Sequence, residues 1–177
     1  MTPEDKIIYD IAINNGFTPN AALFVVAQAR VESADYKSNV YNNNNNAFGM
    51  KYVKQRIATQ GTRSPAREQV SPPSASINFY AKYRNLEDSA KDAIERLFNI
   101  TLRGVTPAML KNARTPLEYA ELQKKRSYFG GTAAKYARLM QAKLPLINAN
   151  FTPPNKTAGL SPLLIIGLLF MLYTLKR

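Results

Sequence analysis

The sequence predicts a mainly helical α+β domain with one small irregular or β-containing lobe, followed by a C-terminal transmembrane helix. Three observations predict this fold class. Thr-Pro pairs precede four apolar periodic segments, no helical period runs between Gly49 and Arg84, and the chain ends in a long uncharged segment. Helices begin readily at Thr-Pro, because Thr accepts a hydrogen bond from a free backbone N–H and Pro has no such donor to leave unpaired.

Six helical segments are expected, each from apolar residues spaced three or four apart and a capping or turn residue before them. In the second segment, Leu23, Val26, Ala27 and Val31 share one face, which is therefore expected to be buried. The expected ranges are residues 3–15, 19–34, 86–98, a short segment after Pro107, 116–125 and 133–144.

The region between Gly49 and Arg84 is expected to form loops with a small hairpin. Ser64-Pro65 and Pro72-Pro73 interrupt any helix there, since Pro lacks the N–H that a helix interior needs. A run of five asparagines precedes this region. Within the run, Asn42 to Asn44 are expected to form a low-complexity loop without a specific role.

The C-terminal part of the chain is expected to lie outside the domain. Residues 148–157 are rich in Pro and Asn, which is typical of a linker, and no charged residue occurs from Ala158 to Leu175. These 18 residues are at the short end for a membrane span, and Lys176-Arg177 would lie at the membrane surface. A buried core helix is the alternative. The predicted organisation is a domain over 1–147, a linker over 148–157 and a membrane anchor over 158–177.

The composition excludes several kinds of site. The chain contains no Cys and no His, so thiolate nucleophiles, Ser-His-Asp triads and Cys/His zinc sites are excluded. Acid–base chemistry near neutral pH must use Asp, Glu, Tyr or Lys. No metal or cofactor is implied. The net charge of +12 favours anionic wall polymers or lipids, whereas no basic run alternates with aromatic residues as in a nucleic-acid module.

Glu32 is the candidate catalytic acid. It follows an apolar helical pattern and lies near the predicted C-terminal end of that helix, where the helix dipole disfavours a negative charge. Apolar neighbours would add desolvation, and both effects raise the pKa of a carboxyl group, as a general acid requires. The alternative is an ordinary solvated glutamate.

The residues around Glu32 resemble glycoside hydrolase family 73, the glucosaminidase domains of flagellar and autolysin type. AQARVES, KSNVY and NNNAFGMK match the family's helix end, Lys-Ser step and NN-apolar-FG-apolar-Lys segment. Weaker matches follow in the expected order over 79–98 and 119–140, so the resemblance covers about residues 5 to 143. The matching residues are Ala27, Gln28, Glu32, Ser33, Lys37, Ser38, Asn45, Asn46, Phe48, Gly49 and Lys51.

The resemblance implies a lysozyme-like fold and hydrolysis of the β-1,4 bond after N-acetylglucosamine in peptidoglycan. Glu32 would then protonate the leaving oxygen, and Asn46, Phe48, Tyr128 and Tyr136 would line the substrate cleft; a brace of the cleft wall is the alternative role for Asn46. One departure is Ala34-Asp35-Tyr36, which stands where many members have Gly-Trp-Gly.

The second catalytic group is open between two alternatives. Glycosidases usually pair two carboxylates, and Glu68 is the only acidic residue between Gly49 and Arg84. It matches the place where some family members carry a glutamate in the lobe. A solvated loop charge is an equally good interpretation of Glu68. Otherwise the N-acetyl oxygen of the substrate itself would attack, and no second carboxylate would be needed.

The predicted function is that of a membrane-anchored peptidoglycan hydrolase. The N-terminal MTPEDKIIYD lacks the pattern of a secretion signal, so a virion membrane, as in a bacteriophage, is one location that would bring the enzyme to a cell wall. Two other classes stay open. One is a non-catalytic glycan-binding or assembly protein of a membrane or virion, and the other is a membrane structural protein that binds nucleic acid through its charge.

Overall fold

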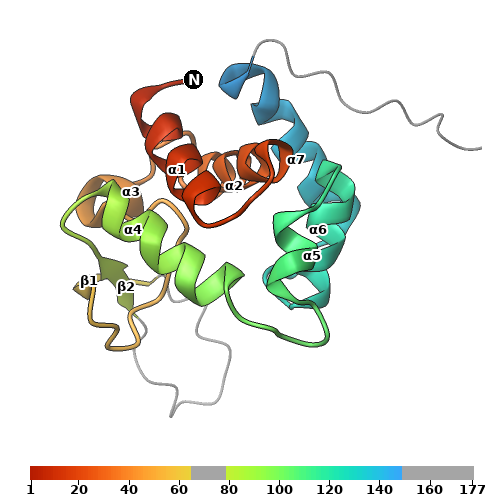
Figure 1. The fold of residues 1–177 in the computed structure, drawn as a ribbon. Coiled ribbons are helices and arrows are strands. Elements are labelled where there is room, and N and C mark those ends of the chain that lie inside the picture. The colour runs from red at the N-terminus through yellow and green to blue at the C-terminus, as the bar shows by residue number, and fades with distance from the viewer. Residues whose placement is uncertain (65–78, 149–177) are drawn as a thin grey trace, which may run out of the picture.

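The computed structural model describes residues 1–64 and 79–148, which form a mainly helical body with a small two-stranded sheet. Figure 1 shows α2 in the middle, with α3, the sheet and α4 on one side and α5, α6 and α7 on the other. The elements in chain order are α1 (Pro3–Asn14), α2 (Pro19–Glu32), α3 (Asn39–Asn44), β1 (Thr59–Arg63), β2 (Phe79–Lys82), α4 (Leu86–Ala93), the π-helical η2 (Ile94–Phe98), α5 (Pro107–Lys111), α6 (Pro116–Lys125) and α7 (Ala133–Ile147).

The predicted helix starts are confirmed, and the cause is capping. Thr2, Thr18, Thr106 and Thr115 each precede a helix, and each side chain accepts a hydrogen bond from a backbone N–H three residues later. These bonds satisfy donors that have no partner inside the helix. The local sequence therefore determines where the helices begin.

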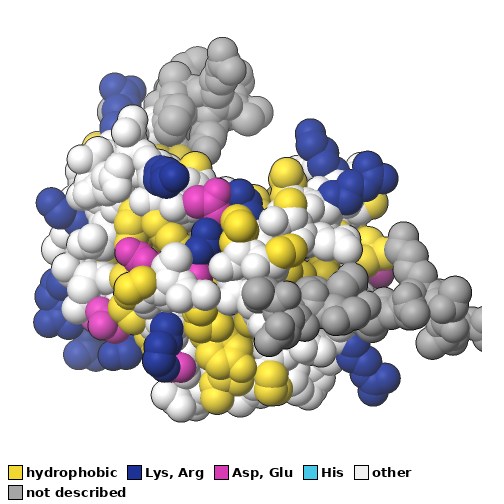
Figure 2. Space-filling view, turned by 90° about the horizontal axis from the view of Figure 1, so that it is seen from above, with side chains coloured by type: hydrophobic (Ala, Val, Ile, Leu, Met, Phe, Trp, Pro, Cys, Tyr) yellow, Lys and Arg dark blue, Asp and Glu magenta, His cyan; other side chains and the backbone are white. Residues whose placement is uncertain are grey.

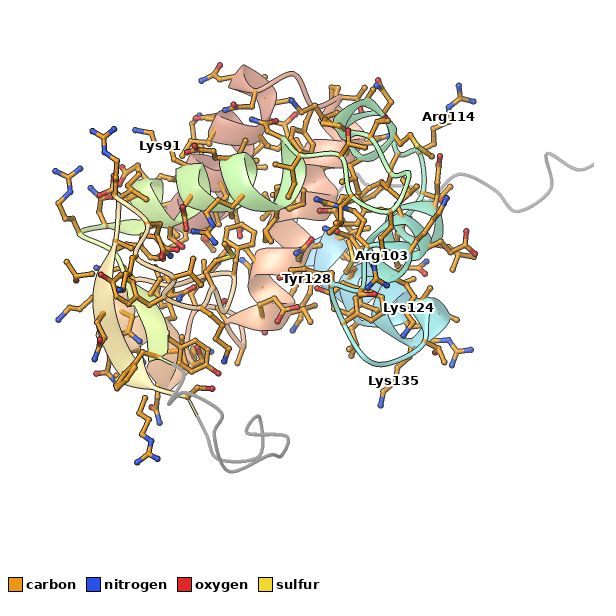
Figure 3. The ribbon with its side chains drawn as sticks, turned by 90° about the horizontal axis from the view of Figure 1, so that it is seen from below. Lys91, Arg103, Arg114, Lys124, Tyr128 and Lys135 are labelled. Carbon is orange, nitrogen blue, oxygen red and sulfur yellow. The ribbon has the colours of Figure 1, made fainter. Side chains whose placement is uncertain are left out.

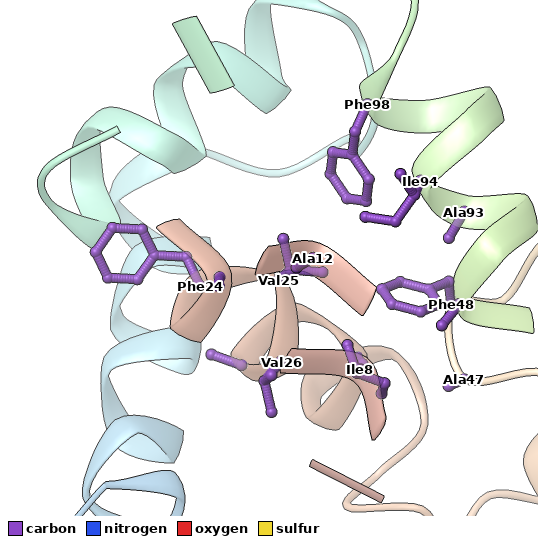
Figure 4. Close-up of a cluster of buried hydrophobic side chains, with 14 of the residues drawn as sticks. Ile8, Ala12, Phe24, Val25, Val26, Ala47, Phe48, Ala93, Ile94 and Phe98 are labelled. Carbon is purple, nitrogen blue, oxygen red and sulfur yellow. The ribbon is translucent and has the colours of Figure 1, made fainter. Parts of the chain in front are cut away.

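Helix α2 is buried on all sides, and not on one face as predicted. Every residue from Ala21 to Arg30 is buried, because α1 packs against one side of α2 and α7 against another. A helix that is apolar all round is suited to this central position. Figure 4 shows the core around it, with side chains from α2, α1, α4, η2 and the loop before the sheet. The labelled residues are Ile8, Ala12, Phe24, Val25, Val26, Ala47, Phe48, Ala93, Ile94 and Phe98.

The lobe contains the predicted hairpin and one unpredicted helix. Strands β1 and β2 pair antiparallel, with a register irregularity between Gln60 and Arg63. The asparagine run forms α3, and the expectation that Asn42 to Asn44 have no role is wrong for Asn44. Its side chain is buried, donates a 2.7 Å hydrogen bond to the Thr62 hydroxyl and accepts one of 3.2 Å from the Thr62 N–H. A Cβ at Gly61 would lie 2.5 Å from Asn44 Oδ1, so this contact requires glycine.

Several helices differ from their expected ends. Helix α1 stops one residue early, at Asn14, and the segment 86–98 divides into α4 and the π-helical η2. Helix α2 stops at Glu32 because Ala34, Asp35 and Tyr36 all take left-handed backbone conformations, with φ of 51°, 56° and 64°. Helix α7 continues beyond Leu144 to Ile147, with Pro145 inside it.

The predicted membrane anchor over 158–177 and the candidate Glu68 lie outside the described residues. Within 1–64 and 79–148, no helix combines the length and the apolar character needed to cross a membrane. The transmembrane part of the predicted fold class therefore stays a prediction.

Candidate active site

Glu32 is the last residue of α2 and lies between two distant parts of the chain. Its Oε1 accepts a 2.6 Å hydrogen bond from the hydroxyl of Tyr136 in α7. On the lobe side, Gly49 faces the other carboxylate oxygen, since a Cβ at this residue would lie 4.0 Å from Oε2. Gly49 has a φ of 62°, a conformation that favours glycine. The carboxyl group is therefore flanked by α7 on one side and the loop before the sheet on the other.

The surroundings of Glu32 raise its pKa. Burial of the carboxyl group is the larger effect and raises the pKa, while the hydrogen bond from Tyr136 lowers it in part. Burial acts in this direction because it disfavours the charged form. The raised pKa predicted from the sequence is confirmed, and desolvation is its main cause.

Tyr136 positions Glu32 through its hydroxyl and is itself held by a neighbouring ring. It is only 7% exposed, and its ring stacks on Phe129 with centroids 4.2 Å apart and an interplanar angle of 15°. The ring was predicted to line the substrate cleft. In the structure its hydroxyl bonds the candidate acid and its ring contacts Phe129, a residue that was not among the predicted site residues.

Tyr128 connects the α6–α7 loop to the lobe. Its side chain is half-buried, and its hydroxyl donates a 3.3 Å hydrogen bond to the main-chain carbonyl of Phe48. Burial and then the charge of Glu32 raise the pKa of the phenol, while the amide of Gln28 lowers it. Figure 3 shows Tyr128 between α2 and the side of the molecule that carries α6 and α7. The structure thus brings Tyr128 and Tyr136 together at Glu32.

Asn46 and Phe48 lie in the interior, although both were predicted to contact substrate. Asn46 is fully buried, and its side chain exchanges hydrogen bonds of 2.8 Å and 2.9 Å with the backbone of Met50 and donates a further 2.9 Å bond to the Ala81 carbonyl. The ring of Phe48 is 3% exposed and belongs to the core. Asn46 therefore braces the lobe, as its alternative role states, and Phe48 contributes its main-chain carbonyl to the site.

Gln28, one turn before Glu32, has a structural role beneath the site. Its side-chain oxygen accepts a 2.7 Å hydrogen bond from the hydroxyl of Tyr119 and a 3.1 Å bond from the amide of Gln123. All three residues are buried. Because Tyr119 and Gln123 belong to α6, this cluster joins the Glu32 end of α2 to the helix that precedes Tyr128.

A charged network fixes the left-handed turn after Glu32. Arg30 is 6% exposed and donates two 2.8 Å hydrogen bonds to the fully buried Asp5, and a third of 3.1 Å to Asp35. Lys143 of α7 binds Asp35 at 2.6 Å, and the Tyr36 hydroxyl donates to Asp5 at 3.0 Å. The turn is therefore tied to both α1 and α7, which explains how three non-glycine residues hold this backbone conformation.

Among the described residues, no carboxylate contributes to the raised pKa of Glu32, whose causes are burial and, in the opposite direction, the Tyr136 hydrogen bond. The same part of the chain has no group of three or more metal-ligating side chains. A surface hollow of about 550 Å³ beside Thr18 and Arg114 is not lined by Glu32. Glu32 is identified by the groups around it and not by a pocket.

Comparison with known proteins places the chain in a family. A sequence model described as Glucosaminidase, mannosyl-glycoprotein endo-beta-N-acetylglucosaminidase, matches residues 9–148. A search of curated proteins finds no match.

Solved structures share the fold at low identity. A peptidoglycan hydrolase from Sphingomonas sp. A1 has 18% identity and a TM-score of 0.56, with 84% of this chain and 94% of that chain covered. The catalytic domain of the autolysin Auto from Listeria monocytogenes has 21% identity and a TM-score of 0.53, with 81% and 80% covered. A type VI secretion effector–immunity complex from Pseudomonas protegens has 17% identity and a TM-score of 0.55, with 82% and 88% covered.

The family model covers most of the chain and includes Glu32, both tyrosines and the lobe, which confirms the resemblance to glycoside hydrolase family 73. The chain belongs to the glucosaminidase family and is a glycoside hydrolase.

Proposed function

We propose that the protein hydrolyses the β-1,4 bond after N-acetylglucosamine in peptidoglycan, with Glu32 as the general acid. The observation that carries this proposal is the Glu32 carboxyl group, whose pKa burial raises while Tyr136 holds one of its oxygens. Membership of the glucosaminidase family supports the reaction. The similar folds of a peptidoglycan hydrolase and an autolysin support the substrate.

In the proposed reaction, protonated Glu32 donates its proton to the glycosidic oxygen as the bond from that oxygen to the anomeric carbon breaks. Positive charge develops on the sugar being cleaved, and the leaving sugar departs as an alcohol. Water then adds its oxygen to the anomeric carbon, and its proton restores Glu32 or is taken by a second group. That group is Glu68. In a substrate-assisted reaction, the N-acetyl oxygen instead attacks the anomeric carbon as the bond to the leaving oxygen breaks, and water then displaces it and returns a proton to the carboxylate of Glu32.

Two tyrosines support this step in different ways. Tyr136 fixes the rotamer of Glu32 by donating to Oε1, which leaves Oε2, the oxygen on the side of Gly49, to carry the proton. We assign Tyr128 to sugar contact, since it is half-buried and close enough for the charge of Glu32 to raise its pKa. Aromatic rings suit the apolar faces of sugars, and the hydroxyl offers a hydrogen bond.

We also propose that residues 158–177 anchor the enzyme in a membrane through the linker 148–157, and that the location is a virion membrane. The uncharged segment from Ala158 to Leu175 supports the anchor. Detection of the protein in the membrane fraction of purified virus particles is the expected result. Its absence from particles, together with its presence in envelopes of uninfected cells, would overturn the virion location.

The bond assignment is tested by mass analysis of the fragments that the full chain releases from purified peptidoglycan. New reducing ends on N-acetylglucosamine are the expected product. Reducing ends on N-acetylmuramic acid would keep the enzyme a hydrolase and overturn the bond assignment. Intact binding of glycan without any release would favour the non-catalytic binding protein.

A further inference from the structure

We infer that Arg103 and Lys135 determine specificity by binding the carboxylates of the peptides that peptidoglycan strands carry. The inference rests on the proposed function and names the substrate feature recognised beside the catalytic acid. It starts from the distribution of charge. Residues 99–148 contain nine Lys or Arg and only two acidic residues, Glu118 and Glu121.

Among the described residues, these cations are almost free of acidic partners. Within residues 1–64 and 79–148, Lys143 is the only one of the nine that forms an ion pair. Lys and Arg also stand at several separate places around the molecule in Figure 2, so exposed positive charge alone does not mark a site. What marks a site is the position of particular cations around Tyr128.

Three cations surround the α6–α7 loop that carries Tyr128. The Arg103 guanidinium donates a hydrogen bond to the hydroxyl of Ser127, and the Lys124 ammonium donates to the carbonyl of Gly130 at 3.0 Å. Lys135 directly precedes Tyr136 and is exposed. Figure 3 shows Arg103, Lys124 and Lys135 on the Tyr128 side of the molecule, whereas Lys91 and Arg114 lie away from it.

Arg103 occupies a backbone position that its own residue type does not favour. Leu102 and Val105 exchange backbone hydrogen bonds of 3.1 Å and 3.0 Å around a two-residue turn. Both turn residues have positive φ, 52° at Arg103 and 74° at Gly104, so the turn is of the type that prefers Asn, Asp or Gly at its first position. An arginine at this position does not stabilise the turn, and it places a positive charge at the tip of the turn.

Lys135 also stands against a local preference. It is the third residue of α7, and Thr132 caps the helix by accepting a 3.2 Å hydrogen bond from the Lys135 N–H. A positive side chain in the first turn is disfavoured by the helix dipole, and α1, α4 and α6 all carry acidic residues there. Departures from local preference concentrate at functional sites.

The chemistry of the strand explains why cations would lie at this place. The sugar backbone is neutral where peptides are attached, and the peptides carry free carboxylates. A strand whose sugar contacts Tyr128 would carry its peptides past the α6–α7 loop, where Arg103 and Lys135 stand. Arg binds carboxylates through two parallel hydrogen bonds, and Lys binds them as a point charge. Phosphate-bearing wall polymers share the negative charge, but nothing would place them beside Tyr128 in particular.

The test uses the full chain in detergent, with Arg103→Asn and Lys135→Gln singly and together. Asn suits the left-handed position and Gln removes a charge that the helix dipole disfavours, so neither variant is expected to lower the melting temperature. Lys91→Gln and Arg114→Gln are the matched charge controls. The substrates are purified peptidoglycan, the same material with its carboxylates converted to neutral amides, and peptidoglycan freed of phosphate polymers.

On native peptidoglycan, Arg103→Asn and Lys135→Gln are each expected to lower kcat/KM about twofold to fivefold by raising KM, the effect of losing one exposed ion pair. The double variant is expected to lower kcat/KM by about tenfold. Amidation should remove this difference, and the controls should match the wild type. Equal losses on native and amidated substrate, or no loss, would overturn the inference. Loss of the difference after removal of phosphate polymers would assign the cations to that polymer. Failure of the wild type to cleave any substrate would instead refute the proposed function.

Discussion

The Tyr136 hydroxyl donates a 2.6 Å hydrogen bond to Oε1 of Glu32, although 104 positions separate the two residues in the chain. The bond joins α7 to the end of α2, which are packed side by side. It fixes the orientation of the carboxyl group and opposes, without cancelling, the effect of burial on its pKa. The candidate acid therefore depends on the packing of two distant helices.

Replacing Tyr136 with Phe should change both the rate and its pH dependence. A donor to the carboxylate stabilises the charged form, so its loss raises the pKa of Glu32 further and shifts the alkaline limb of the pH–rate profile upward. Loss of orientation should lower kcat by about tenfold. Profiles of Tyr136→Phe and a Tyr9→Phe control measure both effects. An alkaline limb that stays in place in Tyr136→Phe would show that Tyr136 does not act on Glu32.

Glu32→Gln should make the protein more stable at neutral pH. The folded protein raises the pKa of Glu32, so the ionised group destabilises the folded state above that pKa, and this effect disappears below the ordinary value of 4.5. Removal of the charge is expected to raise the free energy of unfolding by about 1 kcal/mol at pH 7, as substitutions at strained active sites often do. Urea unfolding at pH 7 and pH 4 tests this. A stabilisation that is equal at both pH values would contradict the raised pKa.

Arg30→Met should destabilise the fold strongly, because it leaves the fully buried Asp5 without its charged partner. Loss of one member of a buried pair typically costs about 3–5 kcal/mol. The exposed pair Lys6–Asp10 supplies the control, since Lys6→Met should cost less than about 1 kcal/mol. Chemical denaturation of both variants measures the difference. Similar losses of unfolding free energy in the two variants would show that the Arg30 network stabilises the fold no more than an exposed ion pair does.

The same network should make stability fall in acid. Burial raises the pKa of Asp5, but the hydrogen bonds and charge of Arg30, together with hydrogen bonds from Thr2 and Tyr36, outweigh it, and the pKa is lowered below the ordinary 3.8. A lowered pKa contributes stability above 3.8 that is lost as the pH falls through the lowered value. Melting temperatures of the wild type should therefore decline below about pH 4. In Asp5→Asn, which is less stable throughout, that decline should be smaller, and an unchanged slope would refute this role.

Ala34→Gly should stabilise the turn after Glu32. Ala34 is exposed and has a φ of 51°, a conformation that costs a residue with a Cβ about 1–2 kcal/mol and costs glycine little. After the entropy that glycine loses on folding, a gain of about 0.5–1 kcal/mol is expected. Ala108→Gly, inside α5, serves as the control and should destabilise. A loss of stability in Ala34→Gly would show that the turn is not strained.

The sequence predicts the parts of the fold that local chemistry determines. Helix starts follow from Thr-Pro capping, which acts within three residues, and the hairpin follows from the absence of a helical period. The candidate acid was predicted for a similar reason, since Glu32 lies within one contiguous motif. Asn44 and the left-handed turn were missed because their conformations are held by Thr62 and by Arg30, residues whose proximity the local sequence does not reveal.

The roles of the other site residues depend on packing and could not be predicted. Asn46 and Phe48 belong to the motif but lie in the interior, so a motif match identifies neighbours of the site without saying which of them face substrate. Tyr136 was predicted as an aromatic wall, and its bond to Glu32 became evident only when α2 and α7 were placed together. The Phe129 ring that holds Tyr136 gave no signal beyond its aromatic character.

The most direct test of Glu32 as the general acid is the kcat of wild type and Glu32→Gln on purified peptidoglycan, with glycan binding measured in the same samples. Gln keeps the size of the side chain and can accept the Tyr136 hydrogen bond, but it has no proton to give. We expect binding within about twofold of the wild type and a loss of at least about a hundredfold in kcat, the contribution of a general acid. A Glu32→Gln variant that retains wild-type turnover would contradict the assignment of Glu32.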